Sequence, residues 1–237
     1  MYEAIGRMTE EPTVAILAVN EIECHAVIDA FRARDSELTR KIEQVGDHAV
    51  HRLGPRVVLA QSEQGTVGAG SMPWTVHNLI EELEPAVLIL TGICYGLDSR
   101  ELDGGIQELG DLVVATQLRP MDHRKIATHL DGSRRETTRG PSPETPGGLL
   151  SHARALALGR RPTVHFGPVL SLNTLLNNPA ERDRLRILDP EAIAGEMESA
   201  GHVETPDSNA GAAREGVRGP VEERLVRKGR KIRNRTG

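Results

Sequence analysis

The sequence predicts an α/β fold: a three-layer αβα sandwich with a central mixed, largely parallel twisted sheet. Two observations carry this prediction. Short apolar runs recur along the chain, and segments with helical spacing of their apolar residues separate these runs. Continuous apolar runs are typical of strands buried on both faces, and their alternation with helices is typical of parallel sheets covered by helices. The length of 237 residues fits one such domain.

The elements follow one another in a regular order. The first apolar run, Thr13–Val19, predicts a buried strand, and the Asn20 side chain can cap the helix that follows it. Ligands of parallel sheets bind beyond the carboxyl ends of the strands, so polar residues at those ends are candidates for a site. Further strands are expected at 57–60, 86–90, 112–116, 163–170 and 192–194, and further helices at 67–83, 148–158 and 174–185.

Composition narrows the class of protein. Cys24 and Cys94 are the only cysteines, and both lie in apolar contexts without metal-ligand spacing, so we expect reduced core residues. No apolar run reaches the length of about 18 residues that a membrane-spanning helix needs, and residues 1–12 lack the apolar stretch of a signal peptide. We therefore expect a cytoplasmic protein that makes no membrane contact.

The end of the chain differs in composition from the rest. From Arg224 onward the sequence has seven basic residues and no acidic one, and apolar residues are sparse after position 202. Low hydrophobicity with clustered charge is typical of disorder, so we expect a folded domain over 13–200 and a basic, disordered tail over 201–237. Nucleic-acid binding through this tail is one alternative function. The acidic balance of the domain argues against it.

Two acidic residues close the last apolar strand, in the sequence Gly195-Glu-Met-Glu198. Placing carboxylates at the end of a buried strand costs desolvation energy unless a ligand or partner uses them. Strand alternation puts Glu196 and Glu198 on one side and Met197 on the other. A carboxylate there can accept hydrogen bonds from both hydroxyls of a ribose. The alternative is a solvent-exposed acidic start of a helix, which the helix dipole favours.

The segment Ala192–Ala200 resembles the G-E-M-E signature of nucleoside phosphorylases and methylthioadenosine/S-adenosylhomocysteine nucleosidases. The resemblance covers about residues 13–200. It implies cleavage of the N-glycosidic bond of a purine nucleoside or nucleotide, with neither a metal nor an organic cofactor. Four other regions resemble the same family in the same order, namely Val14–Val27, Thr91–Leu97, Leu109–Val114, and Gly167–Ser171 with the following Leu175–Asn177.

The resemblance also implies roles for the acidic residues. Glu198 would bind the ribose hydroxyls, and Met197 would pack against the sugar. Glu196 is the other acid of the signature and receives no definite role. Glu23 matches the acid that positions the attacking water in the nucleosidases, and a carboxylate near the sugar suits general-base activation of water. The alternative for Glu23 is a solvated carboxylate in the first helix.

The remaining site residues are apolar or aromatic. Leu175 and Leu176 occupy the base-contacting positions of the family, and Cys94 and Tyr95 line the pocket through the glycine-bearing turn. Tyr95 stands where the family has a small residue, so it either stacks on a ligand or crowds the pocket. The position of the phosphate-binding Arg of phosphorylases is Leu90 here, which favours hydrolysis over phosphorolysis.

The ending departs from the family pattern. After Gly201 the sequence has no apolar strand ending in the family's S-D motif, whose Asp protonates the leaving base. We therefore expect a sheet that is incomplete at the C-terminus and an activity that is low or lost. The alternative is a catalytically inactive nucleoside-binding or signalling module. The expected partner is a small-molecule nucleoside or nucleotide, with pairing into a homodimer as in other family members.

Overall fold

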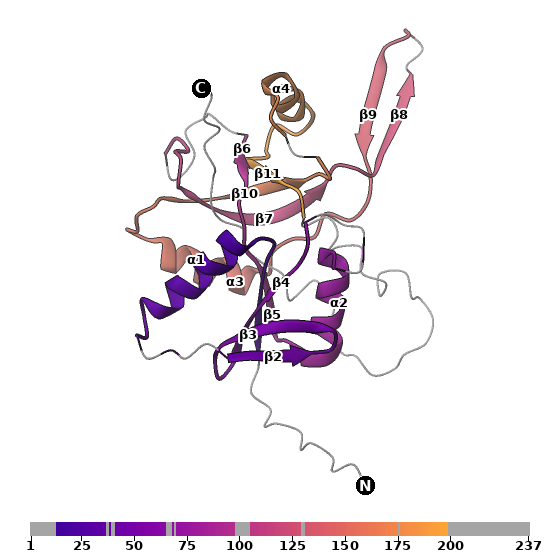
Figure 1. Ribbon diagram of the computed structural model, residues 1–237. Helices are drawn as coiled ribbons and strands as arrows, with labels where there is room; N and C mark the ends of the chain where they lie inside the picture. Colours follow the sequence, from indigo (N-terminus) through magenta and orange to yellow (C-terminus); the bar gives the residue numbers. More distant parts are fainter. Residues whose placement is uncertain are drawn as a thin grey trace.

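The computed structural model describes residues 13–36, 38, 41–64, 68, 70–97, 105–128, 131–174 and 176–198. These residues form an α/β fold, as the sequence predicts (Figure 1). Its helices are α1 (Glu21–Arg32), α2 (Met72–Leu83), α3 (Gly147–Ala157) and α4 (Pro179–Leu188). Its strands are β1 (Val14–Ala18), β2 (Lys41–Val45), β3 (His48–Gly54), β4 (Val57–Gln61), β5 (Val87–Leu90), β6 (Tyr95–Gly96), β7 (Leu112–Pro120), β8 (Arg124–Thr128), β9 (Arg134–Thr138), β10 (Val164–Ser171) and β11 (Ala194–Glu196).

The strands form two sheets and a separate hairpin. One sheet has the order β2-β3-β4-β1-β5, the other has the order β6-β11-β10-β7, and β8 pairs only with β9 among the described strands. The apolar strands pair in parallel: β1 lies between β4 and β5, and β10 lies between β7 and β11. Antiparallel pairs extend the edges through β2, β3 and β6. The predicted mixed sheet thus has parallel strands at the centre of each part.

Helices cover both faces of the five-stranded sheet, which gives the predicted three layers (Figure 1). Ile16 of β1 packs with Ile28 of α1 on one face. Leu17, the next residue of β1, packs with Leu79 of α2 on the other face. This alternation follows from the two-residue period of a strand and explains why β1 is apolar throughout.

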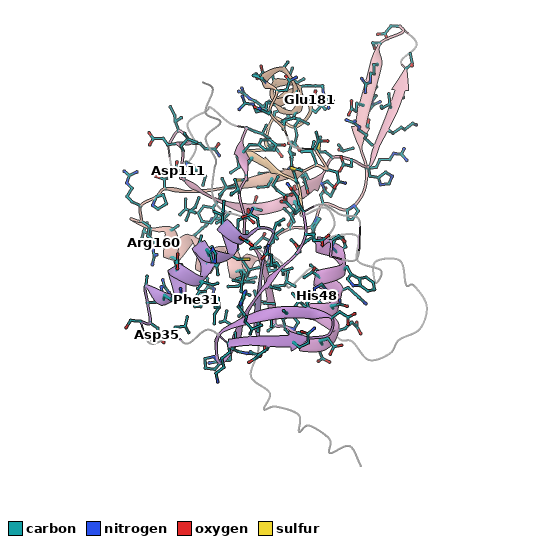
Figure 2. All side chains as sticks on the ribbon, viewed as in Figure 1. Phe31, Asp35, His48, Asp111, Arg160 and Glu181 are labelled. Atoms are coloured by element: carbon teal, nitrogen blue, oxygen red, sulfur yellow. The ribbon has the colours of Figure 1, made fainter. Side chains whose placement is uncertain are left out.

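A second helix pair flanks the four-stranded sheet. Leu185 of α4 is buried against Leu170 and Leu172 at the end of β10, and the Arg154 guanidinium of α3 lies 5.3 Å from the centre of the Phe166 ring. The β8–β9 hairpin projects away from the rest of the molecule (Figure 1). Helix α4, on which Figure 2 labels Glu181, lies near the top of the view. None of the helices in the described part of the chain is long and apolar enough to cross a membrane.

Three element boundaries test the sequence prediction in detail. The Asn20 side chain caps α1 by accepting a hydrogen bond from the Glu23 N–H at 2.9 Å, as expected. The helix predicted from 174 begins instead at Pro179, because Asn178 caps it and proline suits the first turn. The last strand runs over 194–196 rather than 192–194, so Glu196 belongs to the strand itself.

Candidate functional site

The Glu23 carboxylate joins two segments at the carboxyl ends of parallel strands. One oxygen accepts a hydrogen bond from the Val19 N–H after β1 at 2.9 Å. The other accepts from the Ile93 N–H after β5 at 2.8 Å. Glu23 is only 9% exposed and lies in the first turn of α1, where the helix dipole favours negative charge. The solvated-carboxylate interpretation is therefore wrong for Glu23.

The turn that Glu23 holds leads directly to the signature strand. Two residues after Ile93, Tyr95 begins β6, which pairs antiparallel with β11. In that pairing Tyr95 lies opposite Gly195, the residue before Glu196. Cys94 is buried in the apolar cluster beneath the same sheet. The structure thus connects Glu23 to the G-E-M-E segment through a turn of a few residues.

The two acids of the signature are both buried, with exposed fractions of 2% for Glu196 and 7% for Glu198. Glu196 ends β11, and its Oε2 accepts a hydrogen bond from the Glu198 N–H at 2.9 Å. This bond closes a bend over residues 197 and 198, so Glu196 orients the backbone that carries Glu198. The interpretation as an exposed acidic helix start is wrong, since both carboxylates are buried and the segment is a strand followed by a bend.

Gln64 and Leu172 contact the acidic segment and connect it with the ends of β4 and β10. The Gln64 Nε2, just beyond β4, lies 3.8 Å from the Met197 Sδ, so the carboxyl ends of the two sheets meet there. The Leu172 N–H donates to the Glu196 carbonyl at 2.9 Å, which places the end of β10 beside the acids. Neither Gln64 nor Leu172 was predicted as a site residue. No local pattern around either residue distinguishes it from an ordinary loop position.

An apolar surface lies next to the acids. Leu176 is buried in one cluster with Leu172, and the Tyr95 ring packs against that cluster. Burial, and after it the charge of Glu196, raises the pKa of the Tyr95 phenol well above its ordinary value. Leu175, the other predicted base-contacting residue, lies outside the described residues. Among the residues that are described, no three His, Cys, Asp or Glu side chains gather as metal ligands.

The packing of Tyr95 explains why the signature has a glycine at position 195. A Cβ atom on Gly195 would lie 2.3 Å from both the Cζ and the Oη of Tyr95, which is closer than atoms can approach. Tyr95 is large where the resemblance implies a small residue, and Gly195 makes room for its ring. The pair therefore forms one packing unit at the start of the acidic bend.

Comparison with known proteins assigns the fold to a family. A sequence profile of the Phosphorylase superfamily matches residues 13–203, which include the strands, the Glu23 turn and the acidic bend. This chain belongs to the phosphorylase superfamily. The matched range includes every residue that the structure describes.

Two named proteins are similar to this chain in sequence. A death domain-containing ATP nucleosidase of Amphimedon queenslandica is 22% identical over 211 residues, covering 78% of this chain and 38% of that protein. The chain therefore spans well under half the length of this relative. A 5′-methylthioadenosine/S-adenosylhomocysteine nucleosidase of Maridesulfovibrio salexigens is 26% identical over 199 residues, covering 81% of this chain and 78% of that protein.

Solved structures of the superfamily show the same fold. The 5′-methylthioadenosine/S-adenosylhomocysteine nucleosidase of Campylobacter jejuni has a TM-score of 0.66 at 18% identity, covering 96% of this chain and 87% of that one. A futalosine hydrolase mutant of Helicobacter pylori has a TM-score of 0.64 at 17% identity, covering 94% and 89% of the two chains. The fold class predicted from the sequence is confirmed by these neighbours.

Proposed function

We propose that this chain hydrolyses the N-glycosidic bond of a purine nucleoside or nucleotide. The observation that carries the proposal is the buried acidic arrangement at the sheet edge. Glu23 accepts hydrogen bonds from the Val19 N–H after β1 and from the Ile93 N–H in the turn that leads into β6. β6 pairs with β11, the strand that ends in Glu196 and continues into the Glu198 bend. Buried carboxylates held at the carboxyl ends of parallel strands are typical of a site that uses them.

Glu198 suits the binding of a ribose. Its carboxylate offers about four acceptor positions, enough for both hydroxyls of a sugar. Hydrogen bonds from neutral hydroxyls to a charged acceptor contribute about 1.5–3 kcal/mol each. Glu196 supports this role by fixing the Glu198 backbone, and Met197 lies at the same bend to pack against the sugar.

Glu23 suits the activation of water. Its two backbone hydrogen bonds use one acceptor position on each oxygen, so each oxygen keeps a further lone pair for a water molecule. In the proposed step, the water oxygen bonds to the anomeric carbon while the C–N bond breaks, and Glu23 takes the water proton. The base leaves with the bonding electrons and is protonated from solvent. The negative charge of Glu23 also stabilises a positively charged, oxocarbenium-like sugar.

The environment of Leu90 favours water over phosphate as the nucleophile. Leu90 occupies the position where the resemblance implies the phosphate-binding Arg of phosphorylases. Its side chain is 2% exposed and packs in the apolar core with α2. It offers a phosphate neither charge nor a hydrogen bond. The names of the two sequence relatives, both nucleosidases, support the same direction.

Base release from purine nucleosides in phosphate-free buffer tests the proposal. Wild-type protein is expected to release free base, with no acceleration on adding phosphate. Glu23→Gln is expected to lower the rate at least about 100-fold, the usual contribution of general-base catalysis, because an amide cannot take the water proton. Glu21→Gln is the matched control, since Glu21 lies in the same helical turn and is exposed.

Each contrary outcome has a distinct meaning. Phosphate-dependent release with ribose 1-phosphate as product would show a phosphorylase and overturn the assignment of Leu90. Equal rates for Glu23→Gln and Glu21→Gln would remove Glu23 from the reaction. Tight nucleoside binding by wild-type protein without any base release would favour the alternative, a nucleoside-binding module. That alternative draws on one observation, the absence of the family's S-D motif after Gly201.

A further inference from the structure

The Tyr95 hydroxyl is a buried polar group that makes no hydrogen bond to a described residue. Its oxygen is shielded from solvent and has no hydrogen-bond partner in the part of the chain that the structure describes. The residue as a whole is only half-buried, so its exposed surface belongs to atoms other than the hydroxyl oxygen. A buried hydroxyl without a partner destabilises a folded protein, and such groups in native structures call for a reason.

The position of Tyr95 links the two halves of the candidate site. Its strand pairs with β11 at Gly195, one residue before Glu196, and its ring packs against the cluster of Leu172 and Leu176. Carboxylates suit the polar sugar of a ligand, whereas leucine side chains suit the flat faces of its base. Tyr95 is therefore close in the fold to both kinds of side chain.

The hydroxyl is a hydrogen-bond donor at neutral pH. Burial and the nearby negative charge of Glu196 raise the pKa of the phenol, which keeps the proton on the oxygen. Carboxylates of Glu196 and Glu198 are acceptors only, so the ring hydroxyl adds a donor to a site otherwise rich in acceptors. A ring nitrogen of a purine is a matching acceptor.

We propose that the Tyr95 hydroxyl donates a hydrogen bond to a ring nitrogen of the bound base and so makes the site selective for bases with an acceptor at that position. The inference rests on the proposed function, which places a purine beside Leu176. It accounts for a donor that has no acceptor among the described residues, because the ligand supplies one. Functional sites commonly retain such locally unfavourable groups.

Paired substitutions in protein and ligand test the inference. The probe is carbocyclic adenosine, in which a CH₂ group replaces the ring oxygen of the sugar so that the glycosidic bond is not hydrolysed. Its 1-deaza, 3-deaza and 7-deaza analogues each replace one ring nitrogen with CH. Wild-type protein is expected to lose affinity on the order of fivefold with one of the three analogues, the size of a neutral hydrogen bond. In Tyr95→Phe the same analogue should bind as well as the parent compound.

The stability of the free protein provides an independent measurement. Removing an unpaired buried hydroxyl should raise the melting temperature of Tyr95→Phe by about 2–4 °C. Thr145→Val is the matched control, because the buried Thr145 hydroxyl already donates to the Ala115 carbonyl at 2.7 Å. This control should lower the melting temperature and leave nucleoside affinity unchanged. If Tyr95 had only a structural role, Tyr95→Phe would not show both a higher melting temperature and a lower nucleoside affinity.

The outcomes separate this inference from the proposed function. Unchanged affinity of Tyr95→Phe for carbocyclic adenosine, with base release intact in wild-type protein, would overturn the role of Tyr95 alone. A lower melting temperature for Tyr95→Phe would also overturn it, by showing that the hydroxyl is already paired. Absence of both nucleoside binding and base release in wild-type protein would overturn the proposed function and this inference together.

Discussion

At the scale of single residues, burial distinguishes the candidate site from ordinary surface acids. Glu23, Glu196 and Glu198 are each less than one tenth exposed. Two of them are fixed by backbone N–H groups within the fold: Glu23 by Val19 and Ile93, and Glu196 by Glu198. A carboxylate whose position is set by backbone donors is oriented before any ligand arrives, which lowers the cost of binding.

Glu198→Gln tests the ribose-binding residue. The amide keeps the size of the side chain but loses the charge, and one of its two ends becomes a donor that faces the ribose hydroxyls. We expect nucleoside affinity to fall at least about tenfold, from the loss of charge-assisted hydrogen bonds. Calorimetric titration of wild-type and variant protein with carbocyclic adenosine, which is not hydrolysed, measures the change.

Glu196→Gln is the comparison for that measurement. Its amide oxygen can still accept the hydrogen bond from the Glu198 N–H, so we expect a smaller loss of affinity than for Glu198→Gln. Equal affinities of wild-type protein and Glu198→Gln would exclude Glu198 as the ribose ligand. A larger loss for Glu196→Gln would exchange the roles of the two acids.

The sequence predicted the acidic residues but not their geometry. Glu196 and Glu198 could be selected because two acids at the end of an apolar run are unusual, and resemblance supplied Glu23. The contact between Glu23 and Ile93 joins residues 70 positions apart, so no local pattern contains it. The unpaired hydroxyl of Tyr95 is likewise a property of the packed structure.

At the scale of elements, the short antiparallel pair of β6 with β11 connects the Glu23 turn with the acidic bend. β6 has only two residues, yet it places Tyr95 over Gly195 and anchors the turn that Glu23 holds. The absence of a side chain at Gly195 is a requirement of that packing. This short antiparallel pair thus sets the spacing between the turn and the acidic bend.

Gly195→Ala tests the packing unit. The added Cβ would lie 2.3 Å from two atoms of the Tyr95 ring, so the ring or the strand has to move. We expect a loss of about 1–3 kcal/mol in the free energy of unfolding, as for other overpacked sites, measured by urea denaturation. In a Tyr95→Ala background the same change should cost little, because the ring is gone. An equal loss in both backgrounds would mean that Tyr95 is not the obstacle.

Elements with strong local signals were predicted, and those without such signals were missed. β1, β4 and β5 are wholly or almost wholly apolar, β7 and β10 contain short apolar runs, and all five lie near the predicted positions. β2 (Lys41–Val45) and the hairpin strands β8 and β9 are mostly polar and exposed, because each lies at an edge or outside the main sheets. The start of α4 was misplaced although the Asn178-Pro179 pair is itself a start signal.

At the scale of the whole molecule, the superfamily match covers most of the chain. The match covers residues 13–203. The boundary near Gly201 between the domain and the basic segment stays a prediction. Sequence composition alone leads to this boundary, because apolar residues become sparse where basic residues accumulate.

Deletion of residues 203–237 tests whether the body folds without the basic segment. The segment has nine aliphatic residues among 35, too few to add to a hydrophobic core, so we expect the melting temperature and the nucleoside affinity to remain unchanged. Deletion from Asp189 is the matched control, because it also removes β11, which lies between β6 and β10 in its sheet. That control should lose cooperative unfolding, followed by circular dichroism on heating. If deletion of 203–237 alone abolishes the cooperative transition, the basic segment is part of the folded domain and the boundary near Gly201 is wrong.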